Sequence, residues 1–261
     1  IATTGRPGPV LIDLPKNVQA GIAEVELTDK IDARGYKPVI DPDLAKISEA
    51  ADLLAKAEKP IILAGGGVII SQASDELMQM SDLLMAPVVT TFMGKGAFPE
   101  VHPMSVGSIG MHGNPAANRL MSEADVVLAV GTRFSDRAAA NLDTFASNAK
   151  KIHLDIDNAE IGKNIEVDVP IVGDAKVSLK ILYSAVAKKL QKNEGKAWTK
   201  RVKEAKEQLS PLLKEMPKDL VPKALLTELR KLLPENTIVT TEVGQNQMWS
   251  ALYFKALKPR T

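Results

Sequence analysis

Between about residues 42 and 190, short apolar runs rich in Val, Ile and Leu alternate with longer segments whose apolar residues recur every three or four positions. The short runs, at 60–64, 87–91, 124–130 and 150–154, have the length and composition of strands that are buried on both faces. The longer segments have the spacing of amphipathic helices. Because strands that alternate with helices align in parallel, the sequence predicts an α/β fold with a doubly wound parallel sheet.

The helices expected between these strands can be placed by their apolar positions. In the first helix Leu44, Ile47, Ala51 and Leu54 share one face, and the helix is expected to start near Pro42. The methionines of the second helix stand at helical spacing, which is typical of core filling and not of metal binding. The helical segments are 44–57, 75–85 and 176–190, and a last strand lies at 167–172.

The pattern changes on both sides of this region. Residues 10–14 predict a short strand that ends a preceding unit, and 17–37 predict a polar linker. Lys and Glu dominate 191–218, where a helix with a sparse apolar face is typical of a solvated connector. A helix at 222–233, a strand at 236–242 and a helix at 248–253 follow. Because one strand and a helix cannot form a core, we expect them to open a further domain, and the predicted divisions are 1–34, 35–190 and 191–261.

The predicted strands end in residues that suit a ligand. The glycine triplet at 65–67 lets the backbone approach a ligand with its N–H groups free, although a tight connection between elements needs the same residues. Glycines also break the chain after the second run, at 94 and 96. Asp155 follows a later strand, where nucleotide-binding folds place a carboxylate for ribose hydroxyls and where a helix cap is the alternative.

Two arginines follow the run at 124–130. Arg133 and Arg137 lie four residues apart, and their planar guanidinium groups suit a phosphate. The alternative is a pair of solvated arginines at the start of a helix. Open α/β sheets bind ligands beyond the carboxyl ends of their strands, so the joint interpretation of these strand ends is a single nucleotide crevice.

Composition excludes several classes of protein. The chain has no cysteine, which excludes disulfides, thiolate metal sites and a cysteine nucleophile. Its 33 basic and 32 acidic side chains balance, and aromatic residues make up only 4%, so no nucleic-acid surface is indicated. No apolar run approaches the roughly 20 residues of a membrane helix, and the first residues do not have the pattern of a signal peptide. We therefore expect a cytoplasmic protein that binds neither nucleic acid nor membrane.

An ordered series of motifs resembles the acetohydroxyacid synthase (acetolactate synthase) family, in its large catalytic subunit. The resemblance implies the Rossmann-like central FAD-binding domain of a thiamine-diphosphate enzyme, flanked by the end of a pyrimidine-binding domain and the start of a pyrophosphate-binding domain. The motifs are Gly5-Arg6-Pro7-Gly8-Pro9-Val10, Gly65-Gly66-Gly67, Thr91-Phe92-Met93-Gly94-Lys95-Gly96, Gly110-Met111-His112-Gly113, Arg133-Phe134-Ser135-Asp136-Arg137, Ile152-His153-Leu154-Asp155-Ile156-Asp157 with Glu160-Ile161-Gly162-Lys163-Asn164, and Val243-Gly244-Gln245-Asn246-Gln247-Met248-Trp249.

The resemblance also implies which residues contact cofactors. The family commonly has leucine where Phe92 stands, aspartate where Ser135 stands and histidine where Asn246 stands. It places its activating glutamate and its magnesium-binding motif outside this chain, so neither a catalytic residue nor a metal ligand is expected here. The residues that match FAD contacts are Arg6, Gly65, Gly66, Gly67, Thr91, Phe92, Met93, Met111, His112, Gly131, Thr132, Arg133, Ser135, Arg137, Asp155, Ile156, Asp174 and Ala175, and those that match positions near thiamine diphosphate are Val243, Gly244, Gln245 and Asn246.

The activity implied by the family is that of a transferase in branched-chain amino-acid biosynthesis. Two pyruvates, or pyruvate and 2-oxobutanoate, condense to a 2-aceto-2-hydroxyacid with loss of carbon dioxide. Thiamine diphosphate, held with Mg, carries the chemistry, and FAD has no net redox role. The resemblance further implies homodimers or homotetramers of full-length subunits, a small regulatory subunit as partner, and no activity for this chain alone.

Three alternatives share some of these features. A related thiamine-diphosphate enzyme, such as a pyruvate oxidase, a glyoxylate carboligase or an oxalyl-CoA decarboxylase, would place FAD or ADP in the same crevice. An NAD-dependent deacylase of the sirtuin type has a similar sheet but commonly carries a four-cysteine zinc site, and this chain has no cysteine. A non-catalytic nucleotide-binding or interaction module is the third, because fold alone does not define function.

Overall fold

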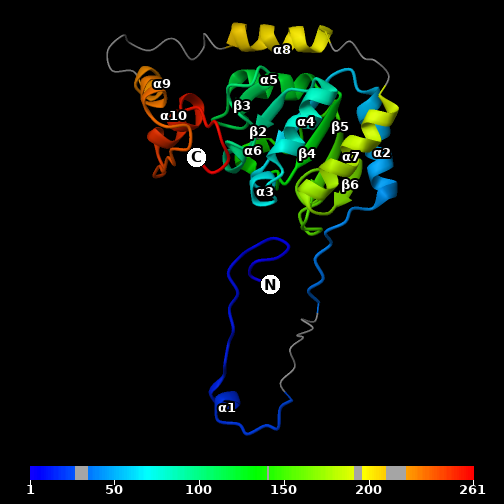
Figure 1. Cartoon of the computed structure of the whole chain (residues 1–261), viewed down its shortest axis with the longest axis vertical. Helices are drawn as coiled ribbons and strands as arrows, with labels where there is room; N and C mark the ends of the chain where they lie inside the picture. Colours follow the sequence, from blue (N-terminus) through cyan, green and yellow to red (C-terminus); the bar gives the residue numbers. More distant parts are fainter. Residues whose placement is uncertain (27–34, 140, 191–195, 210–221) are drawn as a thin grey trace.

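The computed structural model describes residues 1–26, 35–139, 141–190, 196–209 and 222–261. Its centre is a parallel sheet of six strands in the order β3-β2-β1-β4-β5-β6 (Figure 1). This is the order of the classical dinucleotide-binding fold, in which the chain reverses direction of travel across the sheet between β1 and β4. The strands are β1 (Pro60–Ala64), β2 (Val88–Thr90), β3 (Ser105–Ser108), β4 (Val126–Val130), β5 (Lys150–Asp155) and β6 (Val169–Val172).

Two apolar cores form because successive residues of each buried strand face opposite sides of the sheet. Ile62 of β1 packs in the core beneath α2, α4 and α7, whereas Ile61 and Leu63 pack on the side of α5 and α8. The prediction of a doubly wound parallel sheet is therefore confirmed. The helices are α1 (Lys16–Gln19), α2 (Leu44–Lys56), α3 (Gly66–Ile70), α4 (Ser74–Leu84), α5 (Pro115–Glu123), α6 (Asp136–Ala139), α7 (Ala175–Lys189), α8 (Lys196–Leu209), α9 (Pro222–Leu232) and α10 (Gln245–Tyr253), with the 3₁₀ turn η1 (Phe92–Gly94).

The structure corrects two details of the predicted sheet domain. The helix expected to start near Pro42 begins at Leu44, an exposed residue of the first turn, and Asp43 caps it by accepting a hydrogen bond from the backbone N–H of Ala45. The sequence reasoning also missed β3, whose serines and glycine at 105–108 lack the apolar run of a buried strand. It takes its place at the edge of the sheet by pairing with β2.

The two strands predicted outside the sheet domain do not form. Residues 10–14 and 236–242 are irregular, because a strand needs a hydrogen-bonding neighbour and neither segment has one among the described residues. In the first segment Leu11 and Ile12 are exposed. The linker predicted at 17–37 lies partly outside the described residues, and its described part holds the short helix α1.

The charge-rich segment also differs from its prediction. Within 191–218 the described residues form α8, which packs on α5 and crosses one side of the molecule (Figure 1). Trp198, Val202 and Ala205 are buried in the second core, and the Trp198 indole N–H donates to the carbonyl of Pro60 at 2.9 Å. The interpretation as a solvated connector was wrong, because a sparse stripe of apolar residues is enough to bury one helix face.

Candidate functional site

Three strand ends meet at the switch point between β1 and β4. A Cβ atom on Gly65 would lie 2.1 Å from the carbonyl oxygen of Gly131, and one on Gly94 would lie 2.2 Å from that of Ala64. Gly131 itself has φ +58°, a left-handed conformation that favours glycine. These glycines therefore let the backbones after β1, β2 and β4 touch, which closes the floor of a crevice at the carboxyl edge of the sheet.

The glycine triplet at 65–67 mainly allows the neighbouring strand ends to pack together, which the sequence analysis gave as the alternative to a ligand contact. Its N–H groups were expected to be free for a ligand, but Gly65 donates to the carbonyl of Val130 at 2.8 Å and Gly67 to that of Gly131 at 3.0 Å. The reason is that the same close approach that requires glycine also brings acceptors of the neighbouring strand within reach.

The crevice above this floor is a cavity of about 810 Å³. Ligand sites commonly measure about 300–1,000 Å³, so its size suits a small molecule or cofactor. Most of the residues predicted to contact FAD line it, although they come from segments spread from the N-terminal loop to the start of α7. These are Arg6, Gly66, Gly67, Thr91, Phe92, Met93, Gly131, Thr132, Arg133, Ser135, Arg137, Asp155, Ile156, Asp174 and Ala175.

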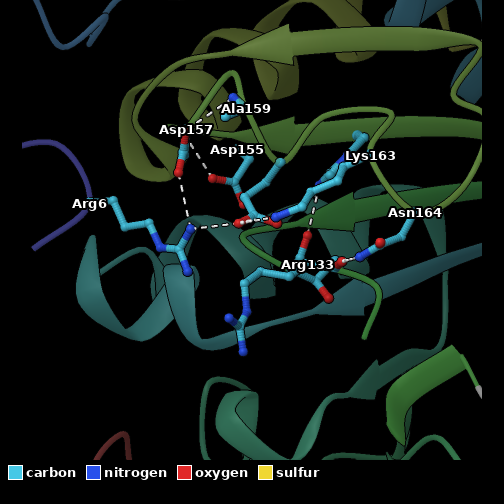
Figure 2. Close-up of polar contacts among 10 residues, drawn as sticks. Arg6, Arg133, Asp155, Asp157, Ala159, Lys163 and Asn164 are labelled. Atoms are coloured by element: carbon cyan, nitrogen blue, oxygen red, sulfur yellow. Dashed lines mark hydrogen bonds and ion pairs between the residues drawn. The ribbon is translucent and has the colours of Figure 1, made fainter. Parts of the chain in front are cut away.

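Arg133 and Arg137 both line the crevice with little to neutralise them. The Arg133 guanidinium points away from the carboxylates at the end of β5 (Figure 2), and no described carboxylate lies within ion-pair distance of it. Its carbonyl accepts a hydrogen bond from Asn164 at 2.7 Å, which fixes its backbone. The Arg137 side chain is 73% exposed, and among the described residues its guanidinium has a 3.9 Å contact with the neighbouring carboxylate of Asp136 and a 3.9 Å contact with the sulfur of Met111. Two guanidiniums beside one cavity favour an anionic ligand.

Arg6 has the opposite environment. Its Nη1 donates to Asp157 at 3.0 Å and to Glu160 at 2.7 Å, so the N-terminal loop is held across the end of the crevice (Figure 2). Burial raises the pKa of the Glu160 carboxyl, but hydrogen bonds from Arg6 and Lys163 outweigh it and bring that pKa below its usual range. The hydrogen bonds to Glu160 and Asp157 raise the pKa of Arg6. The loop is therefore held by charges that persist at neutral pH.

Asp155 ends β5 as a buried carboxyl within the crevice. Its Oδ1 accepts the backbone N–H of Asp157 at 2.9 Å in a turn, so it caps no helix. Burial raises the pKa of Asp155, and the nearby charge of Asp157 acts in the same direction. The alternative interpretation of Asp155 as a helix cap is therefore wrong, and Asp174 is the residue that caps α7: it accepts from the N–H of Val177 and also from the hydroxyl of Ser71 at 2.7 Å.

Sequence reasoning missed the support beneath the arginine loop. His153 of β5 is fully buried, and its Nε2 lies 2.8 Å from the carbonyl oxygen of Thr132. A carbonyl only accepts, so Nε2 carries the proton. Phe134, buried with φ +47°, packs edge-on against the imidazole at 4.9 Å. Burial lowers the pKa of His153, and the neutral ring holds the loop that carries Arg133. The sequence signal that could have identified this support was the position of His153 inside a predicted buried strand.

A second cavity of about 630 Å³ adjoins the first. Phe92 and Arg137 line both cavities, whereas His112 lines only the second, so the prediction of a single crevice holds for Gly66, Met93 and Arg133 but not for His112. Of the C-terminal residues predicted near thiamine diphosphate, Val243, Gly244 and Gln245 also line the second cavity. Gly65, Met111 and Asn246 line neither cavity.

The dinucleotide-type sheet and the two adjoining cavities together define a class of protein. Residues 47–182 match the thiamine pyrophosphate enzyme central-domain family, and the chain belongs to that family. Within it, the whole chain is similar to acetolactate synthase large subunits: it is 48% identical to the probable large subunit of Methanocaldococcus jannaschii, 42% to that of Corynebacterium glutamicum and 39% to that of Buchnera aphidicola from Schizaphis graminum. The resemblance seen in the motifs is thus confirmed.

The chain spans less than half the length of these relatives, 46% of the first and third and 42% of the second, while all of the chain is matched. Among the described residues, no helix is long and apolar enough to cross a membrane.

Proposed function

We propose that the crevice binds FAD and that the chain is the FAD-binding part of an acetolactate synthase large subunit. The observation that carries this proposal is the gathering of the matched residues, from Arg6 to Ala175, around one cavity at the switch point of a dinucleotide-type sheet. The relatives are about twice as long, so we infer that residues 1–34 and 191–261 belong to neighbouring domains of a longer subunit.

The lining of the crevice fits a nucleotide with a diphosphate. Arg133 and Arg137 supply uncommitted positive charge for the phosphates. Asp155 supplies an acceptor for ribose hydroxyls at the far end. Gly66 leaves room for close approach, because a Cβ there would meet Met93 at 3.3 Å. Asp155 and the two arginines would hold the adenosine and phosphate part of FAD, and Phe92 would contact its flavin.

The reaction would belong to the complete subunit. There, thiamine diphosphate with Mg would supply the electron sink for condensing pyruvate with a second 2-oxo acid as carbon dioxide leaves. The part of this chain would be to hold FAD as a wall, with Phe92, which lines both cavities, excluding water between them. Homo-oligomers, a small regulatory subunit and a cytoplasmic location remain predictions of the same proposal.

The test is a titration of the chain with FAD, followed by flavin fluorescence, for wild type, Arg133→Met and Arg137→Met. Each charge-assisted hydrogen bond lost is worth about 1.5–3 kcal/mol, so each variant should bind FAD about ten- to a hundredfold more weakly. Methionine keeps much of the packing of the stem, so the melting temperature without FAD should stay nearly constant. Arg119→Met, on α5 and outside both cavities, is the matched control and should bind like wild type.

Equal dissociation constants for all four proteins would show that the arginines are ordinary surface residues. Tighter binding of ADP than of FAD would favour one of the related thiamine-diphosphate enzymes. We also predict that the chain alone forms no acetolactate from pyruvate and that the complete subunit does. Thiamine-dependent turnover by the chain alone would show that the chemistry had been misplaced.

A further inference from the structure

One ion pair on the loop after β2 lies at the junction between the sheet and the C-terminal segment. The Lys95 ammonium is 2.7 Å from both carboxylate oxygens of Glu100. The two side chains are only 16% and 8% exposed. Most ion pairs on a protein surface contribute little, but a shielded pair with further hydrogen bonds is costly to break, because it leaves one charge buried alone.

Both members of this pair also bond to the C-terminal segment. Lys95 donates to the carbonyl of Ala251 at 3.0 Å, in the last turn of α10, where a cation is favourable. Glu100 Oε2 accepts the N–H of Ala256 at 2.9 Å, and the Glu100 N–H donates to the carbonyl of Ala256 at 3.1 Å. The pair therefore joins two segments that are more than 150 positions apart in the sequence.

The surrounding packing leaves this junction little freedom. Gly96 has φ +83°, and a Cβ atom on it would lie 2.7 Å from the carbonyl oxygen of Lys258. Phe98 and Ala256 are fully buried on the two sides of the junction. The loop and the C-terminal segment thus meet backbone to backbone. Lys95 and Glu100 form the shielded ion pair at that contact, and Lys255 adds an exposed hydrogen bond to the carbonyl of Glu100 at 3.4 Å.

The same helix forms a wall of the second cavity. Gln245, Met248 and Ala251 of α10 line it together with Phe92 and His112. The carbonyl that Lys95 holds belongs to one of these lining residues, and Phe92 lies on the same loop as Lys95. The ion pair is therefore connected to the wall of the cavity through a single helix.

We propose that Lys95 and Glu100 position α10 and so set the geometry between the flavin side of the crevice and a thiamine diphosphate held near residues 243–245. Neither Lys95 nor Glu100 lines either cavity, so the pair acts as a positioning device. This inference rests on the proposed function for the identity of the ligands, but the placing of α10 can be tested without any ligand.

The first experiment measures hydrogen exchange by mass spectrometry in the chain as it stands, for Lys95→Met, Glu100→Gln and the double variant. Losing the pair should speed exchange of the amides at 245–258 about ten- to a hundredfold and leave the strands of the sheet unchanged. The double variant should exchange no faster than the single variants, since the partners act through each other. Lys46→Met, which breaks an exposed pair with Glu49 on α2, is the control and should alter nothing at 245–258.

The second experiment measures both cofactors in the complete subunit. The variants should bind thiamine diphosphate about tenfold more weakly while FAD affinity stays at the wild-type value, a split that general destabilisation would not produce. Faster exchange throughout the chain, unchanged exchange at 245–258, or equal weakening of both cofactors would overturn the proposal. A wild-type chain that bound no FAD would refute the proposed function alone, because the exchange experiment needs no ligand.

Discussion

Replacing Gly65 with alanine should damage the fold by a purely steric route at the crevice. The new Cβ would lie 2.1, 2.7 and 2.8 Å from the carbonyl oxygen and carbon of Gly131 and the Cα of Thr132. All three are backbone atoms of the neighbouring strand end, so no side chain can turn away. The backbone of Gly65 is extended, at φ −100°, so alanine meets no conformational penalty there and the cost is steric.

The expected loss of stability follows from the backbone atoms that must move to admit the new methyl group. Extra methylenes in a packed interior commonly cost about 1–3 kcal/mol, and contact with backbone on a central strand places Gly65→Ala at about 3 kcal/mol. For a chain of this size each kcal/mol lowers the melting temperature by about 2–4 °C, so we expect a loss of about 6–12 °C. The assay is thermal and urea unfolding without cofactor, followed by circular dichroism.

Two further glycines provide matched controls. A Cβ on Gly8 would meet nothing within 4 Å, so Gly8→Ala should leave the melting temperature within about 1 °C of wild type. Gly66→Ala would touch only Met93 at 3.3 Å, so it should reduce FAD affinity more than stability. A Gly65→Ala protein as stable as Gly8→Ala would refute the argument that backbone contact at the switch point requires glycine.

Three other predictions concern groups outside the strand junction. The pKa of Glu160 is lowered, so its stabilising contribution is present above its ordinary pKa of 4.5 and is lost as the pH falls below that value. In urea unfolding, Glu160→Gln should therefore lose less stability than the wild type when the solution is acidified. The pKa of His153 is lowered in the folded chain, so as the pH drops below about 6.5 this histidine is protonated in the unfolded chain before it is protonated in the folded chain. The free energy of unfolding of the wild type should therefore decrease as the pH drops through this range, and His153→Gln should lack that decrease. Trp198→Phe removes a buried hydrogen bond to Pro60, and it should cost about 1–3 kcal/mol and speed exchange in α8, whereas unchanged exchange would mean that α8 is not held by this contact.

Much of the sheet could be predicted because its signals are local. Apolar β-branched runs and helical spacing depend only on neighbours along the chain, and they located β1, β4, β5, α2 and α7. β3 could not be found this way, because its serines are polar and give no apolar run. They are buried only because β3 pairs with β2. The segments 10–14 and 236–242 have strand composition, but no described strand pairs with them.

The candidate site, like the sheet, could be predicted from the sequence only in part. The sequence indicated which residues match the family's motifs, since motifs keep residue identity in order, and it placed Arg133 and Asp155 at strand ends. It could not show that Arg6 is paired with Asp157 and Glu160 while Arg133 is not, because partners so far apart in the sequence are chosen by folding. It also could not show that Gly65 and Gly67 donate to the neighbouring strand end rather than to a ligand.

The sequence by itself determined the α/β class, the parallel sheet and the family, because periodicity and ordered motifs survive without coordinates. Only the tertiary structure decided that most of the matched residues divide between two adjoining cavities, with His112, Val243, Gly244 and Gln245 in the second. It also decided that α10 is joined to the sheet by Lys95 and Glu100. The physical reason is that distance, burial and hydrogen-bond partners between remote segments depend on how the backbone closes, and the glycines after β1, β2 and β4 set that closure at the crevice.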